Sequence, residues 1–260
     1  MQPSKSTTTL VSLLASLVGC ASAARPTFAP QAKLGATELQ ALQASADARC
    51  QQLSPKSERA SGYADAVRAQ QAAPKDRNIG LLLARCALMQ ADLESDPARL
   101  ASLAEQGAEA ARLVSLGPTD AEAAYLNALN LGLFVRAKGM MAIGRLSELV
   151  ALLKAAGTKP ELDQGGPWRV LGLLYVKAPA WPIGPGDLDL GLELLKQAAT
   201  QYPEHPLNHL FYAYALIAAG DTPNARSELE RARALAAPQR FGDWAARWRS
   251  EADKASAGLH

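Results

Sequence analysis

Residues 165–238 read GGPWRVLGLLYVKAPAWPIGPGDLDLGLELLKQAATQYPEHPLNHLFYAYALIAAGDTPNARSELERARALAAP. The second half of this stretch repeats the pattern of the first. Leu171-Gly172, Tyr175, Leu195, Ala198 and Pro203 return as Tyr212-Ala213, Leu216, Leu229, Ala232 and Pro238. Each half predicts a helix, a turn that carries Gly-Asp, a second helix and a terminating proline.

This arrangement is typical of tetratricopeptide repeats, in which small residues let two helices cross closely and large apolar residues fill the space between them. The rest of the chain is rich in Ala and Leu, with helical spacing of its apolar residues. The sequence therefore predicts an all-α, tetratricopeptide-like α-solenoid of about five helix pairs plus a C-terminal capping helix. The expected helices before the repeat stretch cover 37–53, 57–73, 79–93, 97–116, 121–137 and 145–156, and the cap covers 241–255.

The spacing of terminating prolines shows that most repeats are longer than usual. Pro74, Pro118, Pro160, Pro203 and Pro238 are separated by 44, 42, 43 and 35 residues, against a usual repeat of about 34. The extra residues fall in the turn between the two helices of a pair, at 90–97, 136–144 and 177–186. We expect these three padded turns to cluster at one edge, where they either bind a partner or only fill space over the concave surface.

Residues 1–19 have the features of a lipoprotein signal peptide. Lys5 supplies a positive charge, and 10–18 form an apolar run too short to span a bilayer. Leu17-Val18-Gly19-Cys20 resembles a lipobox, which predicts lipidation of Cys20 and a membrane attachment through that lipid. The alternative is ordinary cleavage after Ala21-Ser22-Ala23, with Cys20 incidental.

The lipidated N-terminus and its Pro-containing tether would cover 20–35, followed by the helical domain at 36–260. The residue after Cys20 is Ala rather than the Asp that retains many lipoproteins at the inner membrane. By that resemblance we expect an outer-membrane lipoprotein that faces the periplasm. The formal net charge is only +2, without a basic tract, so the composition gives no indication of nucleic-acid binding.

Two further cysteines, Cys50 and Cys86, lie on predicted helices that would be neighbours in the stack. In an oxidising periplasm they can form a disulfide. Buried cysteines also behave as small apolar side chains, and the sequence leaves both interpretations open.

Two of the padded turns contain candidate residues for a partner or ligand edge. Arg136 and Lys138 make the second turn basic, which suggests either an anion site or a solvated rim. The third turn reads KAPAWPIGPG, and its prolines restrict the backbone before binding, so less ordering entropy is lost later. Trp181, between Pro179 and Pro182, either forms a rigid apolar lip or packs back between helices.

The chain resembles the TatT component family: lipid-anchored, periplasmic, tetratricopeptide-like subunits of tripartite ATP-independent periplasmic (TRAP) transporters. The most specific segment is Gly165-Gly166-Pro167 with the Leu171-Gly172 pair and the proline-rich turn, and 120–132 also fit. The resemblance implies a helical scaffold that forms a trimer, docks a periplasmic solute-binding protein and contains a hydrophobic cleft. The helix at 125–133 lacks the Trp residues expected from the family.

No segment predicts catalysis or a cofactor. His205 and His209 are spaced by four residues, a spacing that suits metal ligands, but no further ligand completes a site. Asp187 and Asp221 are explained as helix caps. Phosphate-loop and nucleophile motifs do not occur in the sequence. We therefore predict a non-enzyme without cofactor or metal.

Two functions fit this sequence. The first is an accessory, protein-binding subunit of a TRAP-type uptake system. The second is a general tetratricopeptide adaptor in envelope assembly or maintenance that binds extended peptides. A deep apolar tunnel or a trimer favours the first, and an open, polar groove on a monomer favours the second.

Overall fold

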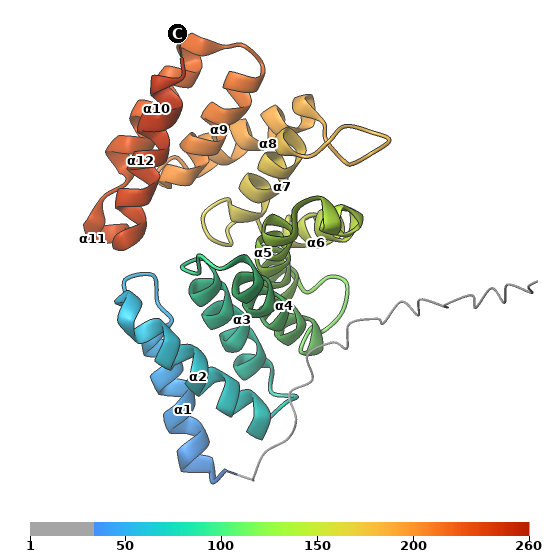
Figure 1. The fold of residues 1–260 in the computed structure, drawn as a ribbon, viewed down its shortest axis with the longest axis vertical. Helices are drawn as coiled ribbons and strands as arrows, with labels where there is room; N and C mark the ends of the chain where they lie inside the picture. Colours follow the sequence, from blue (N-terminus) through green and yellow to red (C-terminus); the bar gives the residue numbers. More distant parts are fainter. Residues whose placement is uncertain (1–33, 260) are drawn as a thin grey trace, which may run out of the picture.

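The computed structural model describes residues 34–259, and these form helices without a β-strand (Figure 1). The helices form five consecutive pairs followed by a cap, which confirms the predicted architecture. The pairs are α1 (Ala36–Arg49) with α2 (Lys56–Ala72), α3 (Arg77–Ala91) with α4 (Pro97–Leu113), α5 (Ala121–Lys138) with α6 (Leu146–Ala156), α7 (Gly166–Lys177) with α8 (Leu188–Gln201), and α9 (Pro206–Ala218) with α10 (Thr222–Leu235). A 3₁₀ helix, η1 (Gly139–Arg145), joins α5 to α6. The cap consists of α11 (Pro238–Phe241) and α12 (Asp243–Ala257).

Aspartate caps determine where many of the helices begin. The side chain of Asp187 accepts a hydrogen bond from the backbone N–H of Leu190 at 3.0 Å, and Asp221 does the same for Asn224 at 3.3 Å. Each bond satisfies one of the unpaired N–H groups at a helix start. These contacts are consistent with capping roles for the two Gly-Asp turns.

The first helix and the cap differ from the sequence expectation in ways that local contacts explain. The first helix ends at Arg49 instead of residue 53, because Ser54 folds the chain back by donating from its hydroxyl to the carbonyl of Ala48 at 2.9 Å. The cap was expected as one helix, but Gly242, with φ of 54°, separates α11 from α12. Glycine accepts this left-handed conformation without steric cost.

Close helix crossings depend on small side chains. A Cβ atom at Gly107 in α4 would lie 2.2 Å from Asn130 Oδ1 of α5 and 2.8 Å from the Cβ of Ala87 in α3. Gly172 in α7 similarly approaches Leu195 of α8. These glycines let neighbouring helices of the stack approach more closely than any larger residue permits.

The solenoid curves until its C-terminal cap returns to the N-terminal repeat. In Figure 1 the end of the cap near α11 lies beside the turn between α1 and α2. Gly242 lies against this turn, since a Cβ atom there would be 3.4 Å from the carbonyl oxygen of Gln52. The cap thus covers the open end of the stack on one side and meets its beginning on the other.

The cap packs through an apolar stripe of Phe241, Trp244, Ala245 and Trp248. Phe241 and Trp248 are buried with ring centroids 5.1 Å apart, and Ala245 is buried between them. The stripe packs on the α9–α10 pair. None of the helices within 34–259 has the length and apolar character needed to cross a bilayer.

Candidate functional site

An apolar cavity of about 410 Å³ lies where the curved stack meets its cap. Helices α3, α5, α9 and α12 contribute its walls. The apolar and aromatic lining consists of Leu88, Met89, Tyr125, Leu129, Leu133, Leu207, Phe211, Trp244 and Trp248. The polar lining consists of Gln52, Asp92, Arg136, Asp163, Arg247 and Glu251. This composition, apolar with a few polar groups, is typical of small-molecule sites.

Helix α5 forms the longest wall. Tyr125, Leu129, Leu133 and Arg136 follow one another at helical spacing on a single face of α5. At 1.5 Å per residue, the first and last of them are about 16 Å apart along the helix axis. The cavity is therefore elongated, with a phenol at one end of this wall and a guanidinium at the other.

Ion pairs line the cavity at its Arg136 end, which is open to solvent and which we call the mouth. Asp92, just after α3, accepts a hydrogen bond from Arg136 Nη2 at 3.2 Å and one from Arg247 Nη1 at 2.6 Å. Arg247 Nε also donates to Glu251 at 3.3 Å. One carboxylate thus joins the first padded turn, the second padded turn and the cap.

A second contact joins the cap to the N-terminal repeat. The buried guanidinium of Arg59 in α2 lies 5.2 Å from the ring centroid of Trp244, and its Nη2 donates to the carbonyl of Ser54 at 3.1 Å. Burial lowers the pKa of Arg59, an effect that Asp243 and Asp92 oppose. Arg59 therefore supports the Trp244 wall of the cavity from behind.

The other end of the cavity, its floor, is formed by the loop before α7. Asp163 and Gln164 have φ values of 48° and 49°, a conformation that non-glycine residues adopt only when their surroundings enforce it. The Asp163 carboxylate accepts from the Tyr125 hydroxyl at 2.9 Å and is paired with buried Arg169. Burial, reinforced by Asp163, raises the pKa of Tyr125 well above its usual value, so the phenol stays protonated and donates.

Behind the floor, buried polar residues hold this loop in place. Asn208 in α9 accepts from Arg169 Nη1 at 2.8 Å and donates to the carbonyl of Gln164 at 3.0 Å. His205 packs edge-on to Phe241, and burial, followed by the charge of Arg169, lowers its pKa to about 3. His205 is therefore neutral, and its Nδ1 accepts from the N–H of Leu207 at the start of α9.

The predicted edge residues separate into two groups. Arg136 lines the cavity, and neighbouring Lys138 lies 6.0 Å from the ring centroid of Phe134. Pro179, Trp181 and Pro182 lie in the loop between α7 and α8, which is closed by a hydrogen bond from Gly186 N–H to the Pro179 carbonyl at 2.8 Å. Trp181 is 86% exposed. Its side chain projects outward and does not pack between helices.

The three padded turns do not share one edge. The first and second meet through Asp92 and Arg136, whereas the loop between α7 and α8 projects from the side of the molecule away from α12 (Figure 1). The superhelical twist of the stack accounts for this difference, because each pair is rotated relative to the one before it.

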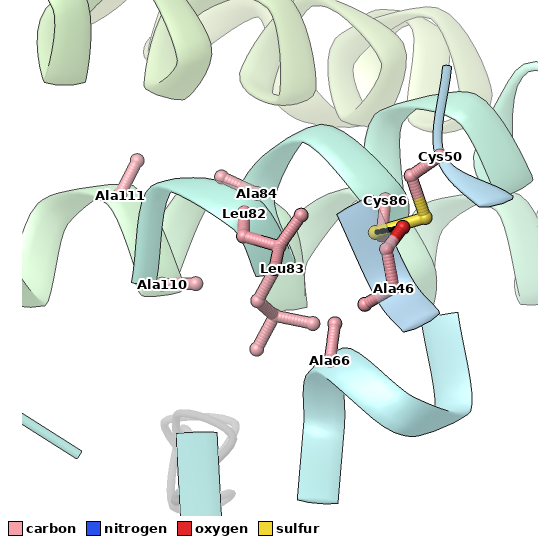
Figure 2. Close-up of a cluster of buried hydrophobic side chains, with 9 residues drawn as sticks. All are labelled: Ala46, Cys50, Ala66, Leu82, Leu83, Ala84, Cys86, Ala110 and Ala111. Atoms are coloured by element: carbon pink, nitrogen blue, oxygen red, sulfur yellow. Dashed lines mark hydrogen bonds between the residues drawn. A yellow bond between two sulfur atoms is a disulfide. The ribbon is translucent and has the colours of Figure 1, made fainter. Parts of the chain in front are cut away.

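Cys50 and Cys86 form a disulfide, with Cα atoms 5.1 Å apart (Figure 2). Both are fully buried, in a cluster with Ala46, Ala66 and Leu83. The bond ties the end of α1 to α3, close to Gln52 and Leu88 of the cavity wall. Cys20, the predicted lipidation site, lies outside the described residues, as do the signal peptide and most of the tether.

The two candidate histidine ligands have structural roles. His205 caps α9, and His209 lies 2.6 Å from Glu228 through Nδ1 and 2.7 Å from the Pro203 carbonyl through Nε2. Within residues 34–259, no group of three or more His, Cys, Asp or Glu side chains is arranged to hold a metal ion.

Sequence reasoning missed most of the cavity. The sequence gives no signal for Asp92 or Asp163, because each is an ordinary surface-type residue within its own repeat. The spacing of Tyr125, Leu129 and Leu133 does predict part of the cavity wall, because it places a continuous apolar stripe on one face of α5. What this stripe faces follows only from the curvature of the stack.

A tetratricopeptide repeat family model matches residues 183–243, from the α7–α8 loop to the start of α12. A search among curated proteins finds no match. The matched helices and the paired architecture define an all-α, tetratricopeptide-type solenoid. Repeats of this kind generally act as scaffolds that bind protein partners, and the fold is typically non-catalytic.

Proposed function

We propose that this protein is a non-catalytic, lipid-anchored accessory subunit of a TRAP-type uptake system, which holds an apolar ligand and docks a periplasmic solute-binding protein. The observation that carries this proposal is the elongated apolar cavity between α5, α9 and α12. An adaptor for extended peptides needs an open groove along its concave face. Here the cap and the Asp92 ion pairs span part of that face, which leaves less of it free for an extended chain.

The proposed location is the periplasmic face of the outer membrane. The Leu17-to-Cys20 motif supports lipid attachment, and the buried disulfide supports an oxidising compartment, where such bonds persist. The resemblance to the TatT family connects both features to TRAP transport.

The α7–α8 loop is the proposed docking element for the solute-binding protein. Trp181 and Ile183 are 86% and 66% exposed at its tip. Large apolar side chains at such exposure commonly mark contact sites, and Trp is enriched among residues that dominate binding energy. The backbone hydrogen bonds from Ile183 N–H and Gly184 N–H to the Ala180 carbonyl, at 3.1 and 3.2 Å, hold the loop in one shape before contact.

The proposal is tested by capturing partners of the C-terminally tagged protein from detergent-solubilised envelopes and identifying them by mass spectrometry. We expect a periplasmic solute-binding protein, and we expect the Trp181→Ala, Ile183→Ser double variant to lose it. Leu116→Ala is the matched control, because Leu116 is 80% exposed but lies in the α4–α5 turn. Mass measurement of the purified complex tests the trimer that the resemblance implies.

Two results would contradict the uptake role. Capture of envelope-assembly factors in place of a solute-binding protein would favour the general adaptor. A solute-binding protein retained equally by wild type and by the loop variant would place its docking site elsewhere on the molecule.

A further inference from the structure

The cavity has a uniform apolar middle. It is lined by Leu129 and Leu133 of α5, Phe211 of α9 and Trp248 of the cap. The charged lining residues belong to the ion pairs at its two ends. Burying polar groups there would cost free energy without a hydrogen-bond partner. The middle therefore suits a hydrocarbon or other apolar body, extended along the roughly 16 Å from Tyr125 to Arg136.

The mouth offers hydrogen-bond donors to solvent. The side chains of Arg136 and Arg247 are 48% and 42% exposed, whereas Asp92, which they share, is only 15% exposed. Within the described part of the chain, Arg136 donates to Asp92 through Nη2 alone, and Arg247 uses Nη1 and Nε. The remaining N–H groups can bind an incoming anion while the Asp92 contacts stay in place.

The floor is built differently. The Asp163 carboxylate already accepts from Tyr125 and is paired with Arg169. A second negative charge at this end would meet a carboxylate whose nearest donors are already engaged. Each end holds both carboxylates and guanidinium groups, and the ends differ in the donors that remain. Arg136 and Arg247 keep unengaged N–H groups beside Asp92 and Glu251 at the mouth, whereas the donors nearest to Asp163 at the floor are already engaged.

We infer that the cavity binds an elongated apolar molecule with a single anionic headgroup, which Arg136 and Arg247 hold at the mouth. This inference rests on the proposed ligand role of the cavity and adds the class of ligand and the residues that select it. The apolar body contributes affinity through burial, and the two guanidinium groups distinguish an anion from a neutral headgroup of the same length.

The test uses two probes of equal chain length, dodecanoate and dodecan-1-ol. Dodecanoate is titrated below its critical micelle concentration, and dodecan-1-ol below its solubility limit. Binding to the purified full chain, carrying Cys20→Ser to prevent lipidation, is followed by calorimetry and by intrinsic tryptophan fluorescence, to which Trp244 and Trp248 of the cavity contribute. We expect dodecanoate to bind about tenfold more tightly than dodecan-1-ol, because its hydrogen bonds are charge-assisted.

Arg136→Gln and Arg247→Gln should each remove most of this preference and weaken dodecan-1-ol binding much less than dodecanoate binding, because a glutamine amide can still donate to Asp92. Retained alcohol binding also shows that the variant is folded. Arg145→Gln is the matched control, because Arg145 is paired with Glu148 and does not line the cavity.

Equal binding of the two probes, or a preference that survives both substitutions, would overturn the inference and leave the cavity as a ligand site without charge selection. Binding of neither probe would overturn it together with the ligand role. Docking of the solute-binding protein is measured separately by the capture experiment, so the two failures can be told apart.

Discussion

Arg247 in the cap and Asp92 after α3 are 155 residues apart in sequence, and their side chains meet at 2.6 Å between Nη1 and Oδ2. This ion pair connects the end of the solenoid to its second repeat. Repeat proteins usually contact only their sequence neighbours. Here the curvature brings distant repeats together, and the apolar cavity lies inside the resulting closure.

Removing this ion pair should loosen the cap without unfolding the protein. Arg247 is about half exposed, so we expect Arg247→Ala to lower the free energy of unfolding by no more than about 1 kcal/mol. Amide hydrogen exchange should nevertheless increase at the start of α12 and in the α1–α2 turn. Arg233→Ala is the control, since Arg233 pairs with Asp253 of α12 away from the cavity. Equal exchange in both variants would show that the ion pair does not hold the cap.

The disulfide should contribute strongly to stability. It closes a loop with a sequence separation of 36 residues, and constraint of the unfolded chain by such a loop is worth about 2–4 kcal/mol. We expect the Cys50→Ala, Cys86→Ala double variant to lose this amount in denaturant unfolding. Unreduced, denatured protein carrying Cys20→Ser should contain no free thiol. A thiol count of two would mean that the bond does not form.

Stability should fall on mild acidification because of His205. Its pKa is lowered to about 3 in the fold, whereas the unfolded chain takes up the proton near 6.5, so between these values the unfolded state binds more protons. Stability contributed by neutral His205 is therefore present above pH 6.5 and is lost as the pH falls. Between pH 7 and 5 this amounts to about 2 kcal/mol.

The pH dependence of the wild type is compared with that of the His205→Asn variant. The asparagine can still cap α9 but does not titrate in this pH range. We expect the free energy of unfolding of the variant to depend less on pH over this range, measured by denaturant unfolding at pH 7, 6 and 5. Parallel pH profiles for the two proteins would refute the assignment.

Two glycine substitutions should have opposite effects. Gly107→Ala forces a Cβ atom against Asn130, whose Nδ2 donates to the Ala84 carbonyl at 3.0 Å and fixes its position. Overpacking of this kind costs about 1–3 kcal/mol. Gly132→Ala, within α5, meets nothing within 4 Å and should stabilise by about 0.5–1 kcal/mol. Thermal unfolding of the pair tests this, and a stable Gly107→Ala variant would argue against the close α3–α4–α5 crossing.

Local residues predicted much of the fold. Pro97 and Pro206 open helices, Asp120 caps α5, and Gly186-Asp187 leads into α8, all through interactions within a few residues. Small residues at Gly172 and Ala213 predicted close crossings within pairs. The sequence also placed Cys50 and Cys86 on neighbouring helices but left a disulfide and two buried thiols equally open.

The sequence by itself determined the helices, their pairing and the order of the stack, because capping, periodicity and small-residue contacts act within one repeat or between adjacent ones. Only the tertiary structure decided where the cap meets the N-terminal repeat, which padded turns come together, and that Arg136 and Arg247 share Asp92. These relationships depend on the rotation accumulated over five helix pairs. No short stretch of residues determines the total rotation, so the cavity forms only when the whole stack is assembled.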